Sequence, residues 1–223
     1  MSIRLWLFGF GVILPLVLAG LPTSRGKAAQ PSLDSETDYA VLLARAKEDP
    51  KTVDFAKLRL AFATTAAYQP YQSYHAEDRE IDTLMKSGDW LRALDLINAL
   101  LDKNYIRIRS HLHAFIAYRK KGDAERASYH RAFVDGLFRS IVNSGDGRTP
   151  ETAFVVINTE EEYDVIGLSG WQPGRQGLQH KGEKSFDVMT VKTSDSGETR
   201  TLYFDITIPW SKSPFGKMAP GKK

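Results

Sequence analysis

The chain has 223 residues, no cysteine, and 30 lysine and arginine residues against 27 aspartate and glutamate residues. The missing cysteine excludes a disulfide framework, a thiolate nucleophile and a thiolate metal site. The near balance of charge argues against a nucleic-acid partner, which a clear basic excess would indicate. The length suffices for one or two small domains with a hydrophobic core.

The chain begins with an apolar run over residues 5–21, which follows Arg4 and precedes a polar stretch. A basic start, a short apolar run and a polar flank are typical of a secretory signal peptide, and the run is short for a membrane span. We expect a signal peptide over residues 1–19, with a cut as late as residue 28, and hence a periplasmic or secreted protein. An uncleaved signal segment is the alternative and the only membrane attachment expected. Leu21 stands where a lipoprotein needs its acylated cysteine, so no lipid anchor is predicted.

Residues 36–143 have apolar side chains at helical spacing, which predicts a series of amphipathic helices. Two similar hexapeptides, GDWLRA from Gly88 and GDAERA from Gly122, are separated by 122 − 88 = 34 residues. That is the period of tetratricopeptide units, where Gly ends one helix in the left-handed conformation and Asp caps the next. We predict tetratricopeptide-like helical hairpins, with a chance hairpin as the alternative because no complete third copy is present.

The segment SGDGRTPETAF, residues 144–154, separates this helical region from a different pattern. Its glycines and its Thr-Pro-Glu are typical of a helix end, a turn and an N-cap. Its spacing matches neither a phosphate-binding loop nor an EF-hand loop. We therefore interpret it as a structural link, while Asp146 and Glu151 remain two carboxylates that could face one pocket.

Residues 144–208 are predicted to form a small α+β region. AFVVIN predicts a short strand, TEEEYDVIGL a helix, and KSFDVMTVKT and TRTLYFDITI a β-hairpin closed by SDSGE. Helices followed by a small antiparallel sheet packed on them make an α+β fold. His180, in GLQHKGEK, is expected in a loop, and residues 209–223, rich in Pro, Gly and Lys, are expected to be a flexible basic tail.

The set of motifs DFAKLRLAF, YQPY, a helix with NYI, and SGDGRTPETAF…EEEY…YFDI resembles a bacterial family of exported proteins known only as a domain of unknown function. The resemblance covers roughly residues 52–208. It implies export, an N-terminal part rich in helices and a short C-terminal β region. It implies no activity and supplies no catalytic residue.

His111 and His130 lie on the apolar faces of two successive predicted helices. His111 stands 11 residues before Gly122 and His130 stands 8 after it. At about 1.5 Å per residue, their heights differ by roughly 5 Å, so they would face each other across one hairpin. With Asp146 they would hold a metal or form an acid–base pair. The alternative, which we favour, is two core histidines with backbone or tyrosine partners, since no H-E-x-x-H motif or third ligand accompanies them. No metal, cofactor or catalytic residue is therefore predicted.

Three further side chains are candidates for binding. Tyr68 and Tyr71, in the tyrosine-rich segment YQPYQSY, would stack on a sugar or peptide, or would pack a loop over the helices, which is the interpretation we favour. Arg59, expected to be exposed, would pair with Glu151 or Asp146 and so tie the two regions together.

Two hypotheses for function follow. Helical stacks bind peptides or protein surfaces along a concave face, so the first is a non-catalytic periplasmic binding or assembly module with an envelope protein or peptide as its partner. The second is a metal-dependent hydrolase that uses His111, His130, Asp146 and Glu151. The hydrolase needs at least three of these side chains in one cleft. The binding module needs an apolar or aromatic groove, with the same side chains dispersed.

Overall fold

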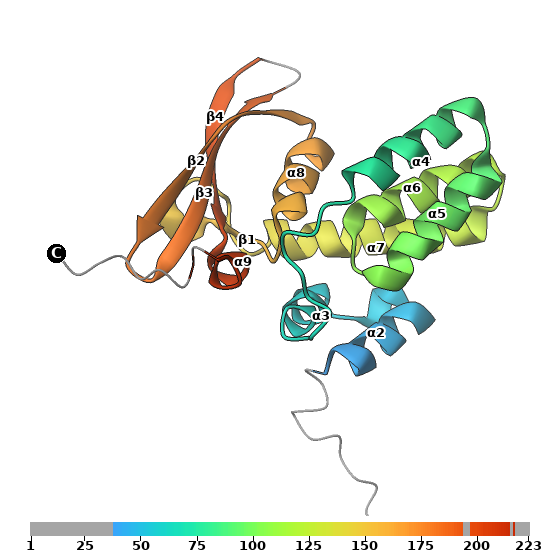
Figure 1. Ribbon diagram of the computed structural model, residues 1–223, viewed down its shortest axis with the longest axis horizontal. Coiled ribbons are helices and arrows are strands. Elements are labelled where there is room, and N and C mark those ends of the chain that lie inside the picture. The colour runs from blue at the N-terminus through green and yellow to red at the C-terminus, as the bar shows by residue number, and fades with distance from the viewer. Residues whose placement is uncertain (1–37, 194–196, 215, 217–223) are drawn as a thin grey trace, which may run out of the picture.

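The computed structural model describes residues 38–193, 197–214 and 216 (Figure 1). The helices are α2 (Tyr39–Glu48), α3 (Phe55–Phe62), α4 (His75–Ser87), α5 (Trp90–Lys103), α6 (Ile108–Lys120), α7 (Ala124–Val142), α8 (Thr159–Leu168) and α9 (Thr207–Ser211), with short 3₁₀ helices η1 (Pro50–Thr52) and η2 (Pro150–Thr152). The strands are β1 (Phe154–Val155), β2 (Trp171–Lys181), β3 (Lys184–Thr193) and β4 (Thr199–Asp205). Most of the helices precede the sheet, so the predicted α+β class is confirmed.

The expected signal peptide, residues 1–19, lies outside the described residues. Within the described ranges, no helix combines the length and the apolar character that a membrane span requires.

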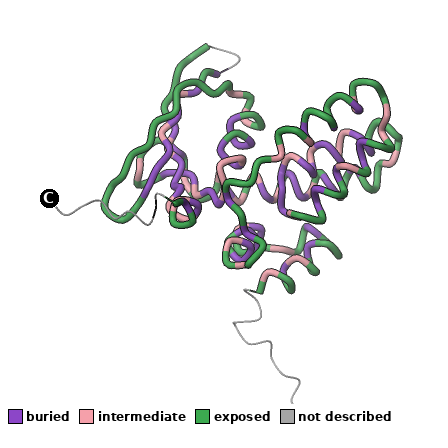
Figure 2. Tube along the Cα trace, viewed as in Figure 1, coloured by how far each residue is buried: buried purple, intermediate pink, exposed green. Residues whose placement is uncertain are grey.

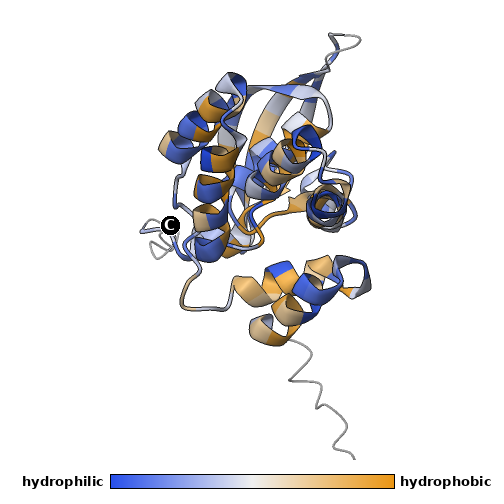
Figure 3. Ribbon diagram, turned by 90° about the vertical axis from the view of Figure 1, so that its right-hand side faces the viewer, coloured by the Kyte–Doolittle hydropathy of each residue, from blue (hydrophilic) through white to orange (hydrophobic). Residues whose placement is uncertain are grey.

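The two Gly-Asp turns form as the repeat predicts. Gly88 and Gly122 have φ angles of 80° and 78°, the left-handed conformation that favours glycine. Asp89 and Asp123 each accept a hydrogen bond from the backbone amide three residues on, at 3.3 and 3.0 Å, and so cap α5 and α7. The α4–α5 and α6–α7 hairpins are thus built alike, 34 residues apart, and α5 packs on α6. Hydrophobic and hydrophilic positions alternate around these helices, as amphipathic periodicity requires (Figure 3).

The sheet has the order β1-β4-β3-β2 and is mixed, which corrects the purely antiparallel sheet expected from the sequence. β2, β3 and β4 are antiparallel, but β1 pairs parallel to β4, with Phe154 opposite Phe204. The reason lies in the connections. α8 carries the chain from β1 to β2 in the same direction, and two antiparallel reversals then bring β4 back to that direction.

The strand β2 was not predicted, and His180 lies on it rather than in a loop. β2 is exposed along almost its whole length (Figure 2). It pairs only with β3 among the described residues, and it is irregular between Pro173 and Gln176. An edge strand that buries neither face has no alternation of polar and apolar residues, and its Gly and Pro suggest a loop instead. Its pairing with β3 decides its structure.

The segment 144–154 links α7 to the sheet through its backbone. The amide of Gly147 donates to the carbonyl of Thr152, and its carbonyl accepts from the amide of Tyr203 in β4, both at 2.8 Å. A Cβ added at Gly145 would lie 2.2 Å from the carbonyl oxygen of Thr152, so a side chain there has no room. Thr149 caps η2. The structure therefore accounts for this segment as a link.

One hydrophobic core joins the two regions. It contains Leu58 and Phe133 from the helices together with Ile157 and Phe204 from the second region, all completely buried. Burial of each such side chain stabilises the fold by about 1.5–3 kcal/mol. α8 lies between the sheet and helices α4–α7 (Figure 1).

The expected tail from residue 209 begins with structured chain. α9 crosses that boundary, and Pro209 and Ser213 are buried. In TRTLYFDITIPW the chain passes from β4 into α9. Burial of the apolar residues of this segment holds α9 against β3. Residue 215 and residues 217–223 lie outside the described residues.

Candidate functional site

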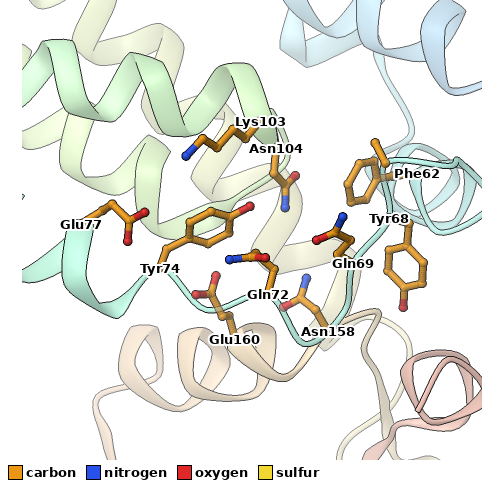
Figure 4. Close-up of a pocket in the computed structure, with 11 residues that line it drawn as sticks. Phe62, Tyr68, Gln69, Gln72, Tyr74, Glu77, Lys103, Asn104, Asn158 and Glu160 are labelled. Atoms are coloured by element: carbon orange, nitrogen blue, oxygen red, sulfur yellow. The ribbon is translucent and has the colours of Figure 1, made fainter. Parts of the chain in front are cut away.

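A cleft of about 420 Å³ opens between the connector that follows α3, the end of α5 and the start of α8 (Figure 4). Its lining combines aromatic, amide and charged side chains. The lining residues are Phe62, Ala67, Tyr68, Gln69, Gln72, Tyr74, Glu77, Lys103, Asn104, Asn158 and Glu160. The aromatic residues Phe62 and Tyr68 lie at one end, whereas Glu77 and Lys103 lie at the other (Figure 4).

Tyr68 fixes the connector to the second region. It is buried, its hydroxyl donates to the carbonyl of Ile157, and its ring meets Phe62 edge-on, with ring centroids 5.9 Å apart. Burial raises the pKa of Tyr68, with a further contribution from Glu161. Tyr68 is therefore a permanent hydrogen-bond donor at neutral pH and forms a rigid wall of the cleft.

Arg59 holds the start of α8 in place, but not through the predicted partners. Its Nε and Nη2 atoms donate to the two carboxylate oxygens of Glu161, at 2.8 and 2.6 Å, and Nη2 also donates to the carbonyl of Val155 at 3.0 Å. Arg59 is only 2% exposed, which corrects the expected surface position, because the guanidinium lies between α3, β1 and α8. It does tie the two regions together.

Arg107 forms a second buried ion-pair network, which contacts Tyr74 and Glu160 of the cleft lining. Its guanidinium donates to both carboxylate oxygens of Asp78, at 2.9 and 2.6 Å, and to both of Glu160, at 2.8 and 3.1 Å. It also lies 5.0 Å from the ring centroid of Tyr74, a cation–π distance. Burial acts to lower the pKa of Arg107, but the hydrogen bonds that it donates to these carboxylates outweigh burial and raise the pKa. The network holds Tyr74 and Glu160 in fixed positions.

Sequence patterns did not predict this network. Asp78, Arg107 and Glu160 lie in three separate segments and belong to no motif. Their convergence follows from packing, because α5 packs on both α4 and α6, and α6 packs on α8.

The two histidines face each other across the α6–α7 hairpin, as their distances from Gly122 predict. Their Nδ1 atoms are 2.9 Å apart, and Nε2 of His111 lies 2.7 Å from the carbonyl oxygen of Tyr105. Because a carbonyl only accepts, His111 donates from Nε2 and accepts at Nδ1, and His130 donates from its Nδ1. Burial, and for His111 also repulsion from His130, lowers their pKa values to about 3 and about 4.

The histidine pair is therefore neutral and buried in the core at neutral pH. His111 stacks on Phe133 with ring centroids 4.3 Å apart, and His130 stacks on Tyr118 at 5.5 Å. Both contacts are typical of core packing, and both ring nitrogens of His111 are already engaged.

The predicted carboxylates lie elsewhere. Asp146 is exposed and accepts hydrogen bonds from the Thr152 hydroxyl and the Arg148 amide. Glu151 forms an exposed ion pair with Lys181. Among the described residues, no three His, Asp or Glu side chains form a group that could hold a metal. The structure thus does not bring together the residues that the hydrolase hypothesis requires.

Tyr71 does not line the cleft. It is 46% exposed, and its hydroxyl hydrogen-bonds with Ser213. Of the two candidate tyrosines, only Tyr68 lines the cleft.

The lining of the cleft is rich in hydrogen-bonding side chains. Four of its side chains are amides, which both donate and accept hydrogen bonds. The described residues that line it include no serine, threonine or histidine.

Comparison with known proteins identifies the family. No curated protein and no solved structure matches this chain. The family described as "Domain of unknown function (DUF4919)" matches residues 28–213, which is well over half of the sequence. The chain therefore belongs to this family, a domain of unknown function.

Proposed function

We propose that this protein is an exported, non-catalytic module that binds an extended peptide segment, carried by a protein of the cell envelope, in the cleft between the connector, α5 and α8. The observation that carries the proposal is the lining of this cleft, with Phe62 and Tyr68 at one end, Tyr74, Glu77 and Lys103 at the other, and amides between them (Figure 4). Its volume of about 420 Å³ suits a short segment of a few residues.

The chemistry of the lining matches an extended peptide. A peptide backbone presents alternating N–H and C=O groups, and the amides of Gln69, Gln72 and Asn104 can satisfy either kind. Phe62 and Tyr68 offer a surface for an apolar side chain. Glu77 and Lys103 offer opposite charges to the other end of the ligand, which would fix its direction.

Two aromatic residues of the cleft lining are preorganised for binding. Tyr74 lies against Arg107, which two carboxylates hold, and Tyr68 is anchored to Ile157. Side chains that are already immobilised lose little entropy when a ligand arrives, and this raises affinity without further contacts.

The export part of the proposal rests on the apolar segment within residues 1–19. It is tested by expressing the full chain in a bacterium with an envelope and sequencing the N-terminus of the protein released from the periplasm. A new N-terminus between residues 20 and 29 supports export. An intact Met1 on a protein found only in the cytoplasm contradicts it.

Peptides selected on this protein should depend on Tyr74. We expect peptides enriched from a phage-displayed heptapeptide library to bind the full chain, and Tyr74→Ala to weaken their binding about tenfold, since truncation of an aromatic anchor typically costs more than 1 kcal/mol. Titration calorimetry measures the change. Gln72→Ala, at an exposed position of the lining, is a second variant that does not disturb the core.

The matched control is Leu91→Ala. Leu91 is 66% exposed and lies outside the cleft lining, so its removal should leave the affinity unchanged. The proposal is wrong if the selected peptides bind Tyr74→Ala and Gln72→Ala as tightly as the native protein, or if Leu91→Ala weakens them equally.

A further inference from the structure

The helix α8 has four acidic residues in its first two turns, and one of them differs from the rest. Three pair with arginines: Glu160 with Arg107, Glu161 with Arg59 and Asp164 with Arg109. Glu162 pairs with no cation among the described residues. Its side chain is completely buried, and neither of its carboxyl oxygens accepts a hydrogen bond from a described residue. A buried polar group in this condition requires an explanation.

Glu162 meets a second acid. Asp187 of β3, itself only 8% exposed, lies against it and accepts a hydrogen bond from Nε2 of Gln176 at 2.7 Å. Burial and then repulsion from Asp187 raise the pKa of Glu162 well above its ordinary value. Glu162 therefore keeps a proton and donates it in a hydrogen bond to Asp187. The pair carries one negative charge, and no cation of the described part of the chain acts on it.

No basic side chain among the described residues compensates this charge. The groups that act on the pair are acidic, phenolic or neutral: Glu161, already paired with Arg59; Tyr163 on α8; Tyr71 on the connector; and Gln176 on β2. Within the described ranges, the pair is thus a place on α8 where a positive charge would be gained at no cost to an existing ion pair.

Exposed apolar side chains surround the pair on its solvent side. Tyr71, Tyr163 and Leu178 are 46%, 42% and 48% exposed. The hydroxyl of Tyr163 donates to Oε1 of Gln176, and Leu178 is the cross-strand neighbour of Asp187. Tyrosine rings attract cations, and apolar side chains pack against an alkyl stem, so this rim suits an amphipathic cation.

We propose that Asp187 and Glu162 bind the ammonium or guanidinium group of an alkyl-chain ligand, as in a lysine or arginine side chain, with Tyr71, Tyr163 and Leu178 as the rim. The cation contacts Asp187, which is the member of the pair that reaches solvent. Glu162 then releases its proton to water. The ligand supplies the positive charge that arginines supply to the other acidic residues of α8. None of these residues lines the cleft, so the site stands independently of the proposed function.

The test compares a charged probe with a neutral one. The full chain is titrated at pH 7.5 with Nα-acetyl-lysine N-methylamide and with the isosteric norleucine compound, and binding is followed by NMR. We expect the lysine compound to bind at least about tenfold more tightly, a difference worth about 1.4 kcal/mol. Because binding releases a proton from Glu162, the affinity of the protein for the lysine compound should rise with pH. The ¹³C signal of the Glu162 carboxyl should titrate at lower pH when the ligand is bound.

Two variants and a control sharpen the test. Glu162→Gln cannot ionise, so it should bind the lysine compound about tenfold more weakly and without the rise in affinity with pH. Asp187→Asn should also weaken binding. Glu151→Gln, which removes an exposed carboxylate outside both sites, should bind as the native protein does. n-Butylamine, tested beside the lysine compound, distinguishes a free amine from a peptide side chain as the preferred source of the cation.

The proposal fails if the lysine and norleucine compounds bind equally, or if both Glu162→Gln and Asp187→Asn leave the affinity unchanged. If Glu162→Gln does not fold, Asp187→Asn and the carboxyl titration of the native protein decide the matter. Peptide binding in the cleft, tested through Tyr74, can succeed or fail separately.

Discussion

Replacement of Arg59 by methionine is expected to lower the free energy of unfolding by about 3–5 kcal/mol, because it leaves the Glu161 carboxylate buried without its cation. Arg59 and Glu161 are both almost completely buried and are joined by two hydrogen bonds. The variant also loses the bond from Arg59 to Val155, which holds β1. Urea denaturation at pH 7.5, followed by circular dichroism, measures the loss.

The double variant Arg59→Met with Glu161→Gln should recover part of this loss. It removes both charges, and the glutamine carbonyl can still accept the amide of Ile157, as Glu161 does at 2.8 Å. Arg92→Met is the matched control, because the Arg92 side chain is 69% exposed and its ion pair is on the surface. If Arg59→Met is no less stable than Arg92→Met, the buried pair does not hold the two regions together.

Acid should destabilise the fold through the histidine pair. The folded pKa values of His111 and His130, about 3 and about 4, lie below the ordinary value of 6.5. Between these limits the unfolded chain binds protons that the folded chain does not, so stability is lost as the pH falls below 6.5. From pH 7.5 to pH 5 the two histidines together should contribute a loss of about 4 kcal/mol.

Two buried carboxyl groups act in the opposite direction. Burial raises the pKa of Asp164 to about 7, and that of Glu162 is also raised. Groups of this kind stabilise the fold at low pH, and the stability is lost as the pH rises through the folded pKa. In the pH dependence of the stability of the native protein, the contributions of the histidines and of these carboxyl groups therefore partly cancel. Only a comparison of variants isolates the contribution of the histidines.

The comparison uses His111→Gln with His130→Gln, since amides retain a donor and an acceptor but do not titrate. Between pH 7.5 and pH 5 this double variant should lose about 4 kcal/mol less than the native protein, as measured by urea denaturation at each pH. Asp164→Asn should change the slope in the opposite sense, with a steeper loss in acid. Parallel pH profiles for the native protein and the histidine double variant would contradict the assignment of a neutral core pair.

The cleft was only partly predictable. Tyr68 is a candidate because tyrosines recur in the connector, and it does line the cleft, whereas Tyr71 does not. The residues of the Arg107 network gave no signal, because Asp78 and Arg107 are 29 positions apart and Glu160 is 53 positions from Arg107. Single charged residues without a motif look like solvated surface positions until the helices are packed.

The sequence by itself determined the features that depend on neighbouring residues: the amphipathic helices, the two Gly-Asp turns, the β3–β4 hairpin and the opposed histidines of one helical hairpin. Tertiary structure alone decided the strand β2, the parallel pairing of β1, and the partner of Arg59, which lies 102 positions away. The physical reason is range. Capping, turns and helical periodicity depend on interactions among a few adjacent residues. The burial of a charge or the pairing of an edge strand depends instead on which distant elements the core brings into contact.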